Sequence, residues 1–172
     1  CEKGSSLDVI KLLVEQCPEA LSKTEGTYFL TPLGLLCKHG ASWEVIKFLV
    51  EACPSAILEA GKLGIISQHR EKNCVGRQLL QLLYDTIRTS FASPKNMDEH
   101  YSKAIAELKR HGWIEGIVIA TRYKPQILHK IDIDMNNHSL MSEVLAKLGR
   151  PNAQLMWELV NIMPPQMFGS TY

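Results

Sequence analysis

The sequence lacks a dominant charge of either sign and lacks long apolar runs. Nineteen Lys and Arg residues stand against eighteen Asp and Glu, so the formal net charge is +1 over 172 residues. Dedicated nucleic-acid binders carry a strong basic excess. No apolar run reaches the roughly 18 residues that indicate a transmembrane helix, and no signal peptide is recognisable. We therefore expect no nucleic-acid partner and no transmembrane segment.

Motifs for catalysis or cofactor binding are also missing. The sequence has no Gly-rich phosphate loop of Rossmann or Walker spacing, no His-Glu-x-x-His and no Gly-x-Ser-x-Gly. Residues 129–138 contain two His and two Asp, but without the Gly and Glu of a calcium-binding loop. We interpret that segment as a turn between helices. We expect no catalytic residue, no cofactor and no bound metal, and therefore no enzymatic activity.

The most informative feature that is present is an internal repeat. Residues 1–21 align without a gap with residues 37–57, and 12 of these 21 positions are identical. A period of 36 residues is typical of helical arrays in which each helix pair buries its apolar face against the next pair. The first copy starts in the middle of a repeat and carries no polar capping segment, so we expect the parent protein to extend further toward its N-terminus.

The second copy carries the residues that suggest a family. It reads Thr-Pro-Leu at 31–33, Gly at 40 and Glu-Val-Ile-Lys-Phe-Leu at 44–49. This pattern resembles the ankyrin repeat, whose period of about 33 residues is slightly shorter. Thr31 and Pro32 suit the cap and first position of a helix. Gly34 stands where the family usually has His, so we expect this repeat to be less rigid or to leave a gap there.

Prolines and cysteines recur in the repeat as well. Pro18 and Pro54 disfavour helix at the residue before them, which predicts helix ends at Cys17 and Cys53. We expect these two thiols to line the helix interior as small hydrophobes. The five cysteines are odd in number and form no Cys-x-x-Cys pair. Unpaired thiols are typical of a reducing, intracellular compartment, and the sequence does not indicate the organelle.

The resemblance implies an all-α fold, an ankyrin-like helical repeat solenoid of about four to five repeats with a degenerate, longer-helix middle module. Residues 1–60 would hold two clear repeats, the first truncated at its N-terminus. Residues 61–110 would form the degenerate repeat with elongated helices, and residues 111–172 two divergent repeats with a C-terminal tail. Trp43 and Trp113 would open second helices, and we expect both of them to be buried, together with Trp157.

Two further predictions concern the weaker copies. In the middle module, apolar spacing predicts one helix over about 73–91 and another capped by Asn96 with Glu99 three residues on. In the later module, the β-branched residues at 114–119 leave a buried strand open as the alternative to a helix.

The resemblance further implies a non-catalytic protein–protein interaction module that binds a partner protein through its concave face and finger loops. The candidate contact residues are Tyr28, Phe29, Lys38, His39, Leu63, Lys109 and Arg110. The apolar finger residues are Tyr28, Phe29 and Leu30 in one finger and Leu63, Ile65 and Ile66 in the next, and they can instead pack onto the neighbouring repeat. The basic residues between 103 and 129 can simply form a solvated face. A permanent structural subunit of a larger multiprotein complex is the first alternative function, and a regulatory or targeting domain of a longer enzyme is the second.

Overall fold

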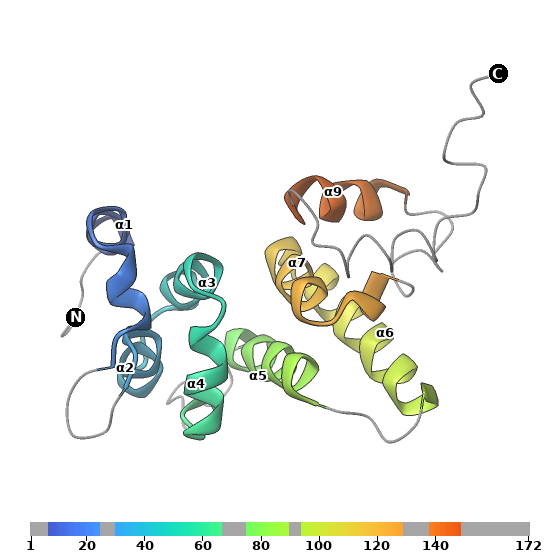
Figure 1. Cartoon of the computed structure of the whole chain (residues 1–172), viewed down its shortest axis with the longest axis horizontal. Coiled ribbons are helices and arrows are strands. Elements are labelled where there is room, and N and C mark those ends of the chain that lie inside the picture. The colour runs from blue at the N-terminus through green and yellow to red at the C-terminus, as the bar shows by residue number, and fades with distance from the viewer. Residues whose placement is uncertain (1–6, 25–29, 67–74, 90–93, 129–137, 149–172) are drawn as a thin grey trace. The chain divides into compact units, whose positions relative to one another are not determined.

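The computed structural model describes residues 7–24, 30–66, 75–89, 94–128 and 138–148. Within these ranges the secondary structure is helical, with no β-strand, so the all-α prediction is confirmed. The chain divides into two compact units, Cys1–Arg88 and Thr89–Tyr172. Figure 1 shows the helices of each unit in chain order.

Unit 1 consists of two successive helix pairs followed by a longer helix. Its elements are α1 (Leu7–Gln16), the 3-10 helix η1 (Pro18–Ser22), α2 (Pro32–His39), α3 (Trp43–Ala52), α4 (Ala56–Lys62) and α5 (Val75–Arg88). Helix α1 packs against η1 and α3, and α2 packs against η1, α3 and α4. Helix α5 packs against α3 and α4. The aligned helices α1 and α3 therefore lie side by side, and so do α2 and α4 (Figure 1).

Unit 2 is centred on one buried helix. Its elements are α6 (Pro94–Arg110), α7 (Ile114–Tyr123), the 3-10 helix η3 (Pro125–Ile127) and α9 (His138–Leu148). Helix α7 packs against each of the other three elements, and its residues 116–121 are all buried. The helical prediction for this segment is confirmed, and its strand alternative is wrong. Trp113 lies just before α7 and is buried, as predicted.

Most helix ends in unit 1 lie where the sequence predicts them. The Thr31 hydroxyl accepts a hydrogen bond from the Gly34 N–H at 3.3 Å, and Pro32 occupies the first position of α2. Helix α1 ends just before Cys17, and α3 ends just before Cys53. Each of these cysteines precedes a proline, which disfavours helical backbone angles at the residue before it.

The same backbone turn recurs before three prolines. Cys17 has φ −146° and ψ 69°, Cys53 has φ −140° and ψ 78°, and Lys124 in unit 2 has φ −136° and ψ 79°. A short helix follows each of them, namely η1, α4 and η3. Both units thus use the same backbone conformation to end one helix and begin the next segment.

The start of α6 differs from the prediction. The helix begins at Pro94, so Asn96 lies inside its first turn and does not cap it. Proline has no N–H to leave unpaired at a helix start, which makes it well suited to the first helical position. Helix α5 spans Val75–Arg88. It lies within the predicted range of about 73–91, and both ends of that range fall outside the described residues. Trp157 lies outside them too.

Two buried side chains line the space beside Gly34. A Cβ atom built on this buried glycine would lie 3.5 Å from Ile65 Cδ1 and 3.6 Å from Leu30 Cδ2. Gly34 thus leaves room for about a methyl group, lined by two residues of the predicted finger segments, and the lower rigidity expected here stays a prediction. Ile66 is buried as well, whereas Leu63 is exposed. The finger residues thus divide between core and surface.

The cysteine prediction is also wrong. Cys17 and Cys53 are half-buried. Each lies just after the last turn of its helix and is therefore not part of the buried apolar stripe of that helix. The Cys17 Sγ donates to a carboxylate oxygen of Glu19 at 3.3 Å, and the Cys53 Sγ lies 3.4 Å from a serine hydroxyl. The fully buried thiol is that of Cys37, on α2. Cys17, Cys37 and Cys53 are free thiols.

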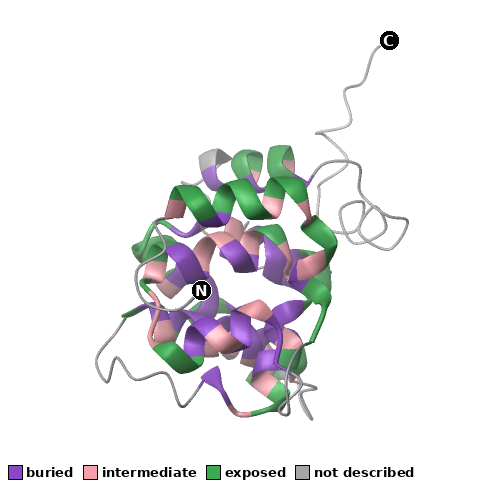
Figure 2. Cartoon of the chain, turned by 90° about the vertical axis from the view of Figure 1, so that its left-hand side faces the viewer, coloured by how far each residue is buried: buried purple, intermediate pink, exposed green. Residues whose placement is uncertain are grey.

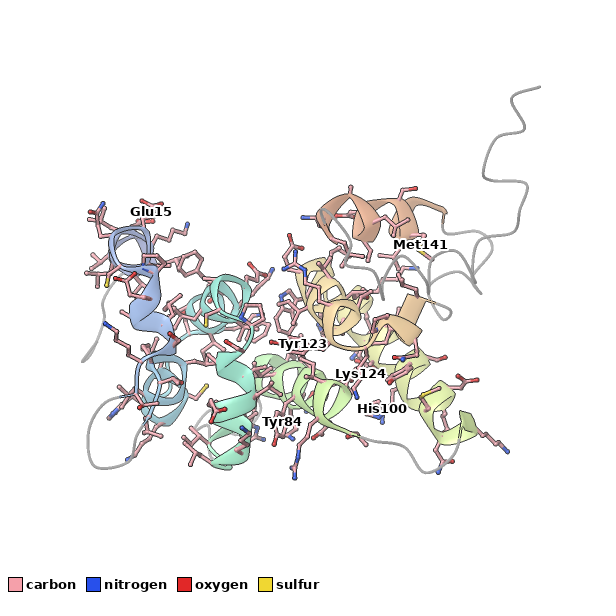
Figure 3. All side chains as sticks on the ribbon, viewed as in Figure 1. Glu15, Tyr84, His100, Tyr123, Lys124 and Met141 are labelled. Atoms are coloured by element: carbon pink, nitrogen blue, oxygen red, sulfur yellow. The ribbon has the colours of Figure 1, made fainter. Side chains whose placement is uncertain are left out.

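Two aromatic rings in unit 1 pack directly on glycines. Trp43 on α3 is half-buried rather than buried, and its ring lies against Gly76 on α5, where a Cβ atom would meet Trp43 Cε3 at 2.4 Å. The buried ring of Tyr84 lies between α5 and α4 (Figure 3). A Cβ atom on Gly61 would meet that ring at 2.1 Å. These glycines allow the helices to approach each other closely.

Candidate interaction surfaces

Three helices, α2, α4 and α6, end in the same glycine-based cap. The glycines Gly40, Gly64 and Gly112 have φ values of 72°, 67° and 65°. This left-handed conformation favours glycine because other residues would strain the backbone there. The N–H after each glycine bonds to a carbonyl oxygen five residues earlier, at 2.9, 3.1 and 2.9 Å respectively. This pattern is the Schellman motif, which satisfies the last carbonyls of a helix.

Exposed basic side chains gather in the last turns of these three helices. They are Lys38 and His39 on α2, Lys62 on α4, and Lys109 and Arg110 on α6. Positive charge near a helix C-terminus is favoured by the helix dipole, which is a structural reason for the pattern. The same placement also directs these side chains into solvent, where a partner can reach them.

The predicted contact residues therefore lie at helix ends. Lys38, His39 and Leu63 belong to unit 1, where α2 and α4 pack against each other. Lys109 and Arg110 belong to unit 2. All five are exposed, and Leu63 is 48% exposed. The other two predicted contacts, Tyr28 and Phe29, lie outside the described residues.

Neighbouring carboxylates dilute the positive charge at two of these ends. Glu107 accepts hydrogen bonds from Arg110, from Nη2 at 2.6 Å and from Nε at 3.2 Å. Lys62 Nζ lies 2.8 Å from Glu59 Oε1. Exposed pairs of this kind contribute only about 0.2–1 kcal/mol each. Each of these two helix ends is therefore of mixed charge rather than strongly positive.

An apolar face on α1 was not among the predicted contacts. Val9, Leu12 and Leu13 are 48%, 57% and 57% exposed. Their spacing of three and four residues places them on one side of the helix. The repeat alignment does indicate that these positions are apolar in both copies, because they match Val45, Phe48 and Leu49 in α3. The alignment alone, however, predicts core positions in both copies.

Two properties of the described residues concern thiol reactivity and metal binding. Burial raises the pKa of the Cys37 thiol to about 12, so it carries almost no reactive thiolate at neutral pH. Within the described ranges, no three His, Cys, Asp or Glu side chains are grouped as metal ligands. Residues 129–137, which include most of the weakly metal-like segment, lie outside those ranges.

No helix that the structure describes combines the length and apolar character needed to cross a lipid bilayer.

Comparison of the chain with protein-family models, with curated proteins and with solved structures finds no match. The basis for a functional assignment is therefore the chain's own repeat, its helix ends and its exposed apolar face.

Proposed function

We propose that this chain is a non-catalytic protein–protein interaction module, an ankyrin-like stack of helix pairs that binds a partner protein at its helix ends and connecting loops. The observation that carries the proposal is the recurrence of the glycine-capped helix ends of α2, α4 and α6. Each presents exposed basic side chains beyond the packed core. A partner can bind to such ends without unfolding or rearranging the helices.

The packing of unit 1 supports the stacked arrangement. Helices α1 and α3 occupy equivalent positions in two copies of the repeat, and they pack against each other. The next pair of neighbours, α2 and α4, also pack against each other. An array of this kind exposes a row of helix ends along one side, which is the surface that repeat proteins use for extended partners.

The mixture of side chains favours a protein as the partner. Leu63 is a large exposed apolar residue beside the Lys62–Glu59 ion pair. An apolar anchor surrounded by polar and charged groups is the usual composition of a protein interface. A nucleic acid would instead require a continuous basic patch, and Glu59 and Glu107 interrupt the positive charge here.

Charge reversal on one helix tests the proposal. Lys109→Glu changes the predicted contact at the end of α6, and Lys103→Glu makes the same change at an exposed position earlier in that helix. The partner is first captured by crosslinking to the 172-residue chain, and its association rate with each variant is then measured. Lys109→Glu is expected to slow association by about 3- to 10-fold at low salt, and Lys103→Glu to leave it within about twofold. Equal effects of the two changes would contradict the proposal.

An apolar pair of variants complements the charged pair. Leu63→Asp removes the proposed anchor, whereas Val75→Asp places the same charge at another exposed apolar residue of unit 1. Truncating an anchor residue at the centre of an interface reduces the binding free energy by about 2 kcal/mol or more. This corresponds to roughly a 30-fold weaker complex. We expect that loss for Leu63→Asp alone. If Val75→Asp weakened the complex equally, Leu63 would not be the anchor.

A permanent structural subunit of a larger complex is the second candidate function. The exposed Leu63 and Val75 of unit 1 favour it, because large exposed apolar side chains are typical of surfaces that are covered in an assembly. The native mass of the protein in its own cells distinguishes the two functions. A discrete particle of fixed composition is expected for a subunit, and a salt-sensitive, partly dissociated complex for a reversible binder.

A further inference from the structure

The face formed by Val9, Leu12 and Leu13 keeps two of its three side chains in the second copy, where Phe48 stands in place of Leu12. In α3 the equivalent Val45 and Leu49 are both buried, at 7% and 3% exposure. The side chains at these two positions are Val and Leu in both helices. The difference in exposure is therefore a difference in neighbours and not in side-chain chemistry.

The neighbours of the two helices explain the difference. Helix α3 packs against α1 on one side and against α5 on the other. Among the described elements α1 packs against η1 and α3, both of which follow it in the chain. Only Ile10 on α1 is buried, and it aligns with Ile46, which is buried in α3. Figure 2 looks onto the side of the chain that carries α1 and shows how far each described residue is buried.

The exposed face is also unlike the outer side of a finished array. Terminal repeats normally carry a polar outer face, because an apolar one would be left in water. The polar side chains of α1 include Asp8, Lys11 and Glu15. They lie outside the stripe that runs through Val9 and Leu13, so that stripe is apolar. Glu15 is labelled on α1 in Figure 3.

We propose that the α1 face is a docking site for one further helix pair of the same repeat, supplied by the same polypeptide. The incoming pair packs on Val9, Leu12 and Leu13 in the way that α1 and α2 pack on α3. The occupant is specified by the repeat itself, because an interface between two consecutive copies already exists in unit 1. This inference goes beyond the proposed function and does not depend on any partner protein.

The test extends the chain with its own sequence. A second copy of residues 1–36 is placed directly before Cys1, so that Leu36 precedes Cys1 as it naturally precedes Cys37. Lys11 of the added copy is changed to Arg, which gives its α1 peptide a distinct mass. Hydrogen exchange of the original α1 is then measured by mass spectrometry in the extended and the 172-residue chains. Exchange in α1 is expected to slow by about tenfold or more when the face is covered.

Variants of the original α1 show whether the face itself is responsible. Leu13→Glu should abolish the protection that the extension gives. Lys11→Gln makes the same change in net charge on the opposite side of the helix and should preserve it. Leu12→Glu is made in parallel, so that a folding defect in one variant leaves the test intact. In the 172-residue chain both Glu variants should change the urea midpoint only slightly, because each of these side chains is already 57% exposed there.

Three results would overturn the proposal. The first is unchanged exchange of α1 in an extended chain whose added helices are themselves protected. The second is unfolding of the 172-residue chain by both Leu12→Glu and Leu13→Glu, which would mean that the face is already covered within this chain. The third is a dimer of the 172-residue chain that Leu13→Glu dissociates in sedimentation velocity, which would make the occupant a second copy.

Discussion

Two glycines in neighbouring helices should respond in opposite ways to the same substitution. A Cβ atom on Gly34 would have its nearest neighbours at 3.5–3.6 Å, which is ordinary van der Waals contact. A Cβ atom on Gly61 would lie 2.1–2.4 Å from three atoms of the Tyr84 ring. Both glycines lie inside helices, α2 and α4 respectively, so the change in helix propensity is the same at the two sites.

The expected free energies follow from these distances. Replacing Gly by Ala within a helix gains about 1 kcal/mol from propensity, and the buried methyl group of Gly34→Ala adds up to about 0.8 kcal/mol. Gly34→Ala should therefore stabilise the fold by roughly 1 kcal/mol. Gly61→Ala must displace a ring that is only 3% exposed, and overpacking of this kind costs about 1–3 kcal/mol, occasionally more. With a clash this short, we expect net destabilisation of about 1–2 kcal/mol.

The measurement is urea unfolding of both variants, followed by far-UV circular dichroism. Hydrogen exchange in the α2 and α4 peptides assigns the change to unit 1, because two units need not unfold together. The two variants should differ by roughly 2–3 kcal/mol at unchanged m-value. If Gly34→Ala destabilised the protein as much as Gly61→Ala, the packing around Leu30 and Ile65 would be described incorrectly.

Three further predictions concern unit 1. The pKa of Cys37 is raised by burial from an ordinary value of 9.0 to about 12, so between these values the unfolded chain binds fewer protons than the folded one. Stability is then full below pH 9 and falls as the pH rises toward 12, and Cys37→Ala should flatten that slope in urea titrations. In native labelling with a thiol reagent, Cys37 should react at least about 100-fold more slowly than Cys17 or Cys53, and comparable rates would contradict the burial of Cys37. Thr31→Ala should cost about 1 kcal/mol because it removes the α2 cap, whereas Ser42→Ala at the start of α3, which has no side-chain cap bond, should cost less than about 0.5 kcal/mol.

Local signals in the sequence were sufficient for most helix ends. Thr31 with Pro32 starts α2, and the prolines after Cys17 and Cys53 end α1 and α3. Each signal acts through backbone groups only a few residues away, so no knowledge of tertiary structure is needed. The start of α6 was mispredicted because Pro94 and Asn96 both suit the beginning of a helix, and the proline comes first.

Features that depend on distant residues could not be predicted. Ile65 lines the space beside Gly34, although the two are far apart in sequence. The exposure of Cys17 depends on its position just outside the helix, which periodicity does not resolve. The α1 face has the same sequence pattern as its buried counterpart in α3, so its exposure follows only from the absence of a described neighbour. For the helix-end residues, the sequence predicts exposed basic charge but not the partner.

Lysine crosslinking of the protein in its own cells, with mass-spectrometric identification of the linked peptides, tests the proposed function most directly. Lys38, Lys62 and Lys109 mark the three glycine-capped helix ends, and the exposed Lys11 and Lys103 serve as controls on other surfaces. We predict that links to a partner protein concentrate at the first three lysines and disappear from them at high salt. Links distributed equally over all five, or a protein that migrates at its own mass without a linked partner, would contradict an interaction module that uses its helix ends.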